Sequence, residues 1–165
     1  MRIGDSILME FGQEAQTTKR LLERIPEDKL AWKPHPKSSS LGQLALHIAS
    51  GPGSAAAAIV PDTMEVPNFS WPEPKSRQEV LDAFSKSLAT ANDTLKKMDD
   101  AQLMSPWTLT SNGKVLMSIP KIGFIRSIMM NHIYHHRGQL SVYLRLLNVP
   151  VPWIYGPSAD ENPFA

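Results

Sequence analysis

The sequence contains no cysteine. Disulfide bonds, thiolate ligands for a metal ion and a cysteine nucleophile are therefore excluded from the chemistry of this chain. Any reaction that uses a thiol must take that thiol from outside the protein.

The sequence also lacks an excess of charge of either sign. Lysine and arginine number 17 and aspartate and glutamate 16, which leaves a formal net charge of +1 at pH 7. Such a balance creates no strong field to attract nucleic acid or an anionic membrane. The basic residues left for a local patch are interpreted as ordinary solvated positions: Lys96, Lys97, Arg126, Arg137 and Arg145. We therefore expect no nucleic-acid partner.

Long hydrophobic runs are missing as well. No segment approaches the ~20 apolar residues that a membrane-spanning helix needs. The amino terminus, MRIGDSILMEFGQEAQ, has acidic and polar residues where a signal peptide keeps an unbroken apolar core. These absences predict a cytoplasmic protein with no membrane partner.

Helical periodicity is the main pattern that the sequence does have. Its 165 residues fit a single domain, 1 to 165. Apolar residues recur at helical spacing in four stretches, which predict helices over 3 to 25, from 41 onward, over 75 to 98, and from 119 to 148. In the second stretch, Pro52 within Gly51-Pro52-Gly53 predicts a kink or an early end, after which SAAAAIV resumes the helix as far as Val60.

The segments between these stretches are rich in proline, as in PEDKLAWKPHPKSSS and PDTMEVPNFSWPEP. An Asn-Gly pair at 112 and 113 predicts a short hairpin or irregular excursion before the last helix. The expected fold class is all-α: a single four-helix bundle with long proline-rich connections and a short hairpin before the last helix.

Three of the five histidines lie within NHIYHHRGQL, residues 131 to 140, on the last predicted helix. His132 and His136 are four residues apart, so their imidazoles lie one turn apart on one face and can share a metal ion. Both belong to a predicted buried seam with alternating spacing of four and three residues: Ile125, Met129, His132, His136, Gln139 and Tyr143. His135 is displaced by about 100 degrees from His136, although a pairing of His132 with His135 at three-residue spacing stays open.

A metal ion with open positions needs a third protein ligand from another element. His47 lies beside Leu44 on the second predicted helix and is expected to face inward, whereas His35 lies between two prolines of a loop. The competing interpretation is that these are core histidines satisfied by hydrogen bonds. Two imidazoles in one apolar seam each have polar nitrogens that need partners, and a shared cation satisfies them most simply.

Four segments carry a family resemblance: IPEDKLAWKPHPKSSSLGQL, LGQLALHIAS, NHIYHHRGQLSVYLRLLNVPVP and YGPSADE. Together they resemble the DinB-like superfamily of bacterial metal-binding four-helix proteins. The pattern of that family is one histidine on the second helix and an HxxxH pair on the last, which here match His47, His132 and His136. The Gly51-Pro52-Gly53 sequence departs from relatives, in which this helix tends to continue.

The resemblance implies a metal-dependent enzyme in which a divalent transition metal, zinc or nickel first and iron or manganese next, activates a water or an external low-molecular-weight thiol. Relatives include thiol S-transferases and proteins similar to metal-dependent hydrolases, and they are commonly homodimers. The alternative is a stress-associated protein that binds a metal or small molecule without turnover. No catalytic base is identified: Glu10, Glu14 and Asp82 are possible partners for the imidazoles, and Gln139 is a further candidate to orient a ligand.

Overall fold

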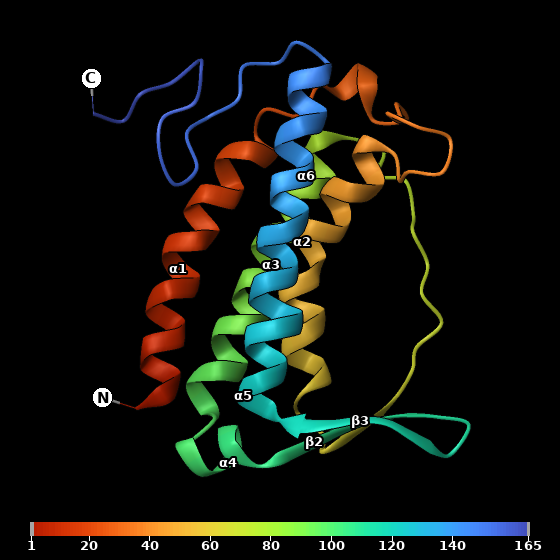
Figure 1. Ribbon diagram of the computed structural model, residues 1–165, viewed down its shortest axis with the longest axis vertical. Coiled ribbons are helices and arrows are strands. Elements are labelled where there is room, and N and C mark those ends of the chain that lie inside the picture. The colour runs from red at the N-terminus through yellow and green to blue at the C-terminus, as the bar shows by residue number, and fades with distance from the viewer. Residues whose placement is uncertain (1, 165) are drawn as a thin grey trace.

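The computed structural model describes residues 2–164. Three long helices come first, a continuous helical run spans residues 121–146, and a carboxy-terminal loop follows it (Figure 1). The helices are α1 (Ile3–Leu22), α2 (Leu41–Ala58), α3 (Arg77–Lys97), α4 (Asp100–Met104), α5 (Lys121–Phe124) and α6 (His132–Leu146), with a 3-10 turn η1 (Glu27–Lys29) and a π-helix η2 (Ile125–Asn131). The strands are β1 (Thr63–Glu65), β2 (Pro106–Ser111) and β3 (Lys114–Pro120).

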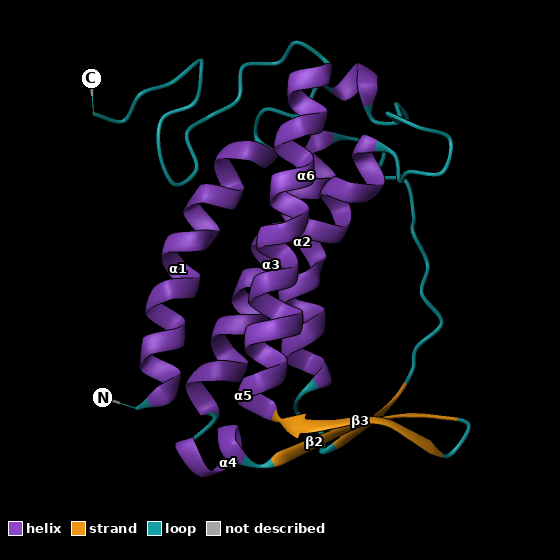
Figure 2. Cartoon of the chain, in the orientation of Figure 1, coloured by secondary structure: helices purple, strands orange, loops and turns teal. Residues whose placement is uncertain are grey.

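The long helices pack side by side around an apolar core. α2 lies against α3 and α6, and α1 lies against α3 and α6 (Figure 2). One half of the core contains Leu21, Ile48, Phe84 and Leu140, and the other half contains Ile7, Leu95 and Ile125 next to the sheet. Within residues 2–164, no helix combines the length and the apolarity needed to cross a bilayer.

The prediction of an all-α fold is wrong, because the chain also forms a three-stranded mixed sheet at one end of the helices (Figure 2). β1 pairs in parallel with β2, and β2 pairs antiparallel with β3. The hairpin turns at Asn112 and Gly113, both with positive φ, where the Asn-Gly pair predicted a turn. The sequence did not predict β1, because a strand of three residues inside a proline-rich connection is too short to show an alternating hydrophobic pattern.

Helix α2 continues through Pro52 instead of ending there. At its start, Ser40 and Gln43 form a capping box. Beyond the proline, the Gly53 N–H donates to Ser87 Oγ at 2.7 Å and the Ser87 hydroxyl donates to the Ser50 carbonyl at 3.2 Å. Ser87 on α3 therefore provides hydrogen-bond partners beside the position where the proline interrupts the backbone ladder.

The last helical run contains a π-helix that the sequence did not predict. A π-helix holds more residues per turn than an α-helix, so it shifts the buried face along the sequence. After η2 the buried positions are Ile133, Arg137, Leu140 and Leu144. Each lies one residue beyond its counterpart in the predicted seam, so the prediction that His132, His136, Gln139 and Tyr143 form that buried seam is wrong.

Candidate metal centre

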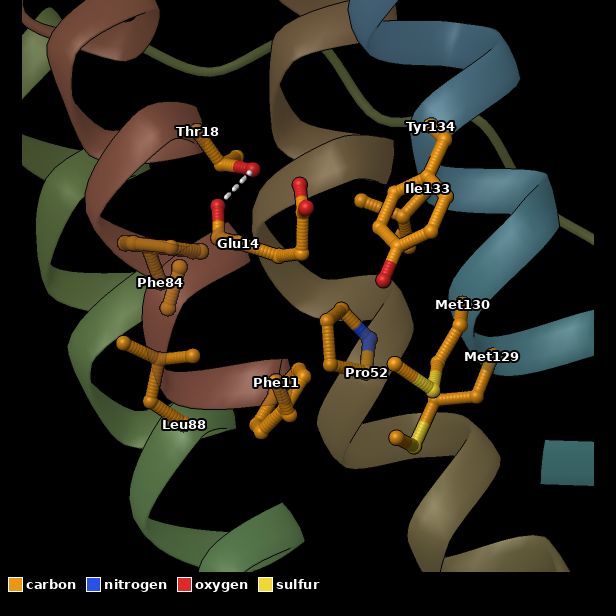
Figure 3. A pocket seen from close by; sticks show the side chains of 11 residues that line it. Phe11, Glu14, Thr18, Pro52, Phe84, Leu88, Met129, Met130, Ile133 and Tyr134 are labelled. Carbon is orange, nitrogen blue, oxygen red and sulfur yellow. Dashed lines mark hydrogen bonds between the residues drawn. The ribbon is translucent and has the colours of Figure 1, made fainter. Parts of the chain in front are cut away.

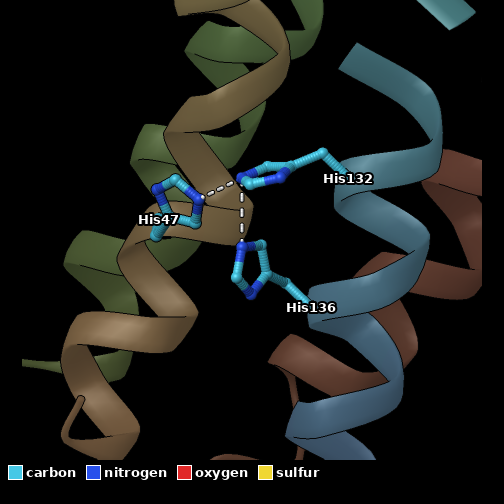
Figure 4. A group of neighbouring side chains, drawn as sticks. All are labelled: His47, His132 and His136. Atoms are coloured by element: carbon cyan, nitrogen blue, oxygen red, sulfur yellow. Dashed lines mark hydrogen bonds between the residues drawn. The ribbon is translucent and has the colours of Figure 1, made fainter. Parts of the chain in front are cut away.

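Three histidines from two helices come together between α2 and α6 (Figure 4). His47 lies on α2 between the buried residues Leu44 and Ile48. His132 and His136 each precede a buried residue of α6, so they lie about 100 degrees from its buried face. All three imidazoles are half-buried.

A glycine allows the two helices to approach closely at this point. A Cβ atom on Gly51 would lie 2.9 Å from Cδ1 of Ile133, the residue that follows His132. Gly51 therefore lies against α6 one turn after His47 on α2. Gly53 lies equally close to α3, where a Cβ would be 2.8 Å from the Cα of Ser87.

The three Nε2 atoms converge. Nε2 of His132 lies 2.9 Å from Nε2 of His47 and 3.0 Å from Nε2 of His136. One ligand atom from each histidine lies within 4.8 Å of the others. The imidazole planes of His132 and His136 are nearly perpendicular, at 85°, as are those of His47 and His136, at 89°.

Hydrogen bonding alone does not satisfy this arrangement. An imidazole nitrogen carries either one proton or one lone pair, so Nε2 of His132 makes one well-directed hydrogen bond and not two. A tetrahedral ion about 2.0 to 2.1 Å from each nitrogen would hold the nitrogens about 3.3 Å apart, close to the separations found here. Three convergent lone pairs fit a divalent transition metal and leave positions for water or a ligand.

The pKa values favour the neutral imidazoles that a metal requires. Burial, followed by repulsion from His136 and His132, lowers the pKa of His47 to about 4. Burial and the neighbouring imidazoles also lower the pKa of His132. For His136 burial is again the main cause of a lowered pKa, partly opposed by its hydrogen bond to Gln139.

Gln139 orients one of the three imidazoles. Nδ1 of His136 lies 2.7 Å from Oε1 of Gln139. Because an amide oxygen only accepts, Nδ1 carries the proton and Nε2 of the neutral ring presents its lone pair to the cluster. The sequence placed Gln139 near the histidines as a candidate orienting group, and the structure gives it this contact with His136.

The other predicted candidates lie outside the cluster. His135 is exposed, with its ring centroid 5.1 Å from that of His136, and it is not in the converging group. His35 is exposed in its loop, where Nδ1 accepts the N–H of Lys37 at 3.2 Å. The open pairing of His132 with His135 is therefore not the arrangement found.

The carboxylates considered as partners for the imidazoles are engaged elsewhere. Glu10 pairs with Arg126 and accepts from Tyr134, and Asp82 accepts from Gln78. Glu14 pairs at 2.6 Å with Arg137, which is only 1% exposed. The interpretation of Arg137 as a solvated position is thus wrong, because its guanidinium is buried against α1.

Trp71 is a contact of the cluster that the histidine spacing did not include. Its ring centroid lies 4.6 Å from that of His47, with the planes tilted by 40°. The other tryptophans pack elsewhere: Trp32 against Tyr143, Trp107 against Phe124, and Trp153 beneath Arg20. No spacing rule links residue 71 to a histidine on α2, so the sequence pattern alone does not bring the two together.

An internal cavity lies among the helices, lined by apolar side chains together with Glu14, Thr18 and Tyr134 (Figure 3). Its volume is about 10 Å³, room for roughly one water molecule. It does not include the three histidines. A small-molecule ligand therefore has no space in this cavity.

The fold and this site define a class of protein: a mainly helical chain with a short sheet, in which two helices supply three histidines with metal-ligand geometry. The sequence model of the DinB superfamily matches residues 10–140, and the chain belongs to this superfamily.

The chain is also similar to one curated protein and to solved structures. "Uncharacterized protein YrdA" of Bacillus subtilis (strain 168) is 26% identical over 161 residues, which cover 95% of this chain and 90% of that protein. A DinB-like protein from Bacillus cereus ATCC 10987 has a similar fold, with a TM-score of 0.74 and 22% identity over 92% of this chain and 97% of its own. The DinB-like protein YjoA of Bacillus subtilis gives a TM-score of 0.67 at 20% identity, covering 87% of this chain and 92% of its own.

Proposed function

We propose that the protein is a metal-dependent enzyme of the DinB superfamily in which His47, His132 and His136 hold one divalent transition metal. The observation that carries the proposal is the position of His132, whose Nε2 lies within 3.0 Å of two other imidazole nitrogens. Hydrogen bonds cannot satisfy both contacts at once, whereas a shared cation can.

Each protein residue has a definite part in this proposal. The three neutral imidazoles present lone pairs, and Gln139 fixes the ring of His136. A metal in this position would act as a Lewis acid and lower the pKa of a water or an external thiol in an open position. With no cysteine in the chain, a thiol substrate would have to come from solution.

The proposed reaction classes are hydrolysis and thiol transfer to a small molecule. Zinc and nickel are the first metals to test, since imidazole binds both well, and iron and manganese follow. We further propose a cytoplasmic homodimer, as the family resemblance implies.

The second candidate is a protein that binds a metal or small molecule without turnover. It is supported by the carboxylates Glu10, Glu14 and Asp82, because their hydrogen bonds and ion pairs are made with residues outside the cluster. Among residues 2–164, the hydrogen bonds of the three imidazoles reach one another and Gln139 but no carboxylate, so no general base is in contact with them.

The decisive experiment is elemental analysis of protein purified without an affinity tag. Wild type should contain about one transition-metal ion per chain, and the His132→Ala, His136→Ala double variant should contain none. Metal-containing wild type is then screened for thiol-transfer and hydrolysis activity, where activity supports the enzyme and its absence the binding protein. Equal metal content in wild type and the double variant would overturn the enzyme proposal and any metal-binding role of the three histidines.

A further inference from the structure

A long loop connects the sheet to α3 and places Trp71 against His47. We refer to residues 66–74 as the strap; it runs from the sheet to the start of α3 (Figure 1). At its first residue, the Val66 N–H donates to the Thr110 carbonyl at 2.8 Å. The strap is therefore tied to the sheet before it reaches α2.

The other end of the strap is fixed to the first turn of α2. The Ser40 hydroxyl donates to Glu73 Oε2 at 2.7 Å, and the Gln43 side-chain amide donates to the Trp71 carbonyl at 2.8 Å. Pro74 lies so close to Gly42 that a Cβ there would be 2.9 Å from the proline ring. These contacts hold the backbone of Trp71 one helical turn from His47.

The Trp71 side chain lies beside His47. Its indole packs on that imidazole, yet Trp71 is 44% exposed. The three histidines are half-buried, and their neighbours Ile48 and Ile133 belong to the core. A ligand bound at the cluster beside His47 would lie next to the exposed part of the indole.

We propose that Trp71 is a specificity-determining residue of this site and contacts the ligand directly. An indole offers a large, rigid, flat apolar surface with little conformational freedom to lose. The preferred ligands join a metal-binding donor group to a flat apolar group that stacks on Trp71. This inference rests on the proposed metal site and adds the class of ligand that the site takes.

The test uses the full-length protein loaded with Co²⁺ and two chelating probes, acetohydroxamate and benzohydroxamate. Both present the same oxygen donors, and only the second carries a flat apolar ring. Dissociation constants are measured from the visible absorption of the cobalt. The preference for benzohydroxamate over acetohydroxamate should fall roughly three- to tenfold in Trp71→Ala relative to wild type.

Three variants separate a ligand contact from a structural effect. Trp71→Phe keeps a flat ring and should retain most of the preference, whereas Trp71→Leu keeps apolar bulk without a ring and should lose it. Phe69→Ala removes an aromatic of the same strap that is 75% exposed, and the wild-type preference should persist. Trp71→Leu also provides the test if Trp71→Ala fails to fold or to bind cobalt.

The results distinguish failure of this inference from failure of the metal site. If Trp71→Ala and Trp71→Leu bind cobalt with a wild-type spectrum and keep the wild-type preference, Trp71 only packs on His47 and the inference is wrong. If wild type gives no cobalt spectrum before any probe is added, or His132→Ala gives the same spectrum as wild type, the metal site itself is wrong. The inference about Trp71 then falls with it.

Discussion

At the scale of single residues, the lowered histidine pKa values predict how stability depends on pH. Burial lowers the pKa of His47 to about 4 and also lowers those of His132 and His136. The unfolded chain then binds protons more readily than the folded one. The contribution to stability is complete above pH 6.5, the ordinary histidine pKa, and is lost as the pH falls toward 4.

The measurement is thermal unfolding of metal-free protein, with a chelator present, between about pH 7.5 and about pH 4. The melting temperature of wild type should fall on acidification more steeply than that of a His47→Gln, His132→Gln variant. His35→Gln, which removes an exposed loop histidine, should follow wild type. Equal pH dependence in wild type and the double variant would contradict the prediction.

Gln139 makes a second prediction at this scale. Loss of its hydrogen bond to Nδ1 of His136 leaves that ring free to turn, so Gln139→Ala should weaken zinc binding by roughly 10- to 100-fold. Gln139→Glu keeps an acceptor oxygen and should bind zinc nearly as tightly as wild type. Competition with a chromophoric chelator measures both, and Gln16→Ala, an exposed position on α1, is the control. Unchanged affinity in Gln139→Ala would remove Gln139 from the site.

At the scale of elements, the glycines around Pro52 set the distance from α2 to its neighbours. A Cβ on Gly53 would lie 2.8 Å from the Cα of Ser87, and backbone cannot move aside as a side-chain end can. Gly53→Ala should therefore destabilise the fold by about 1 to 3 kcal/mol through overpacking. Gly12→Ala, in α1 with nothing within 4 Å, should instead stabilise it by about 0.5 to 1 kcal/mol. Urea unfolding measures the free energy of unfolding of both variants. An unchanged free energy of unfolding in Gly53→Ala would show that α3 can move away from α2.

The elements also show which parts of the structure the sequence could predict. The long helices follow from strong periodicity and from caps such as Ser40, and the hairpin turn follows from Asn112-Gly113. The π-helix is one extra residue in a helical pattern and has no signature in composition, so the buried face was placed one residue too early. The histidine positions were still identified correctly as neighbours, because their four-residue spacing lies entirely within α6, beyond the π-helix.

At the scale of the whole molecule, long-range contacts were the least accessible to sequence reasoning. The pairing of Glu14 with Arg137 joins α1 to α6, and the hydroxyl of Tyr155 from the carboxy-terminal segment also donates to Glu14. Asp160 holds the same segment by accepting the N–H of Val151 and pairing with Arg145. The identity of each pairing partner leaves no local pattern, since a charge that is buried by pairing looks the same in sequence as a solvated one.

Metal binding gives a prediction for the whole molecule, because His47 and His132 are separated by 85 positions in sequence and lie on different helices. A metal that binds only when α2 and α6 are in place stabilises the folded state by mass action, about 2.7 kcal/mol at a free concentration of 100 times the dissociation constant. For a chain of this size, zinc should raise the melting temperature by roughly 5 to 11 °C.

The His132→Ala, His136→Ala variant should show no rise, whereas a His35→Ala, His135→Ala variant, which lacks histidines outside the cluster, should match wild type. Magnesium, which prefers oxygen ligands, should leave wild type unchanged. An equal rise with zinc in both double variants would mean that zinc binds elsewhere and that the three histidines do not join α2 to α6 through a metal.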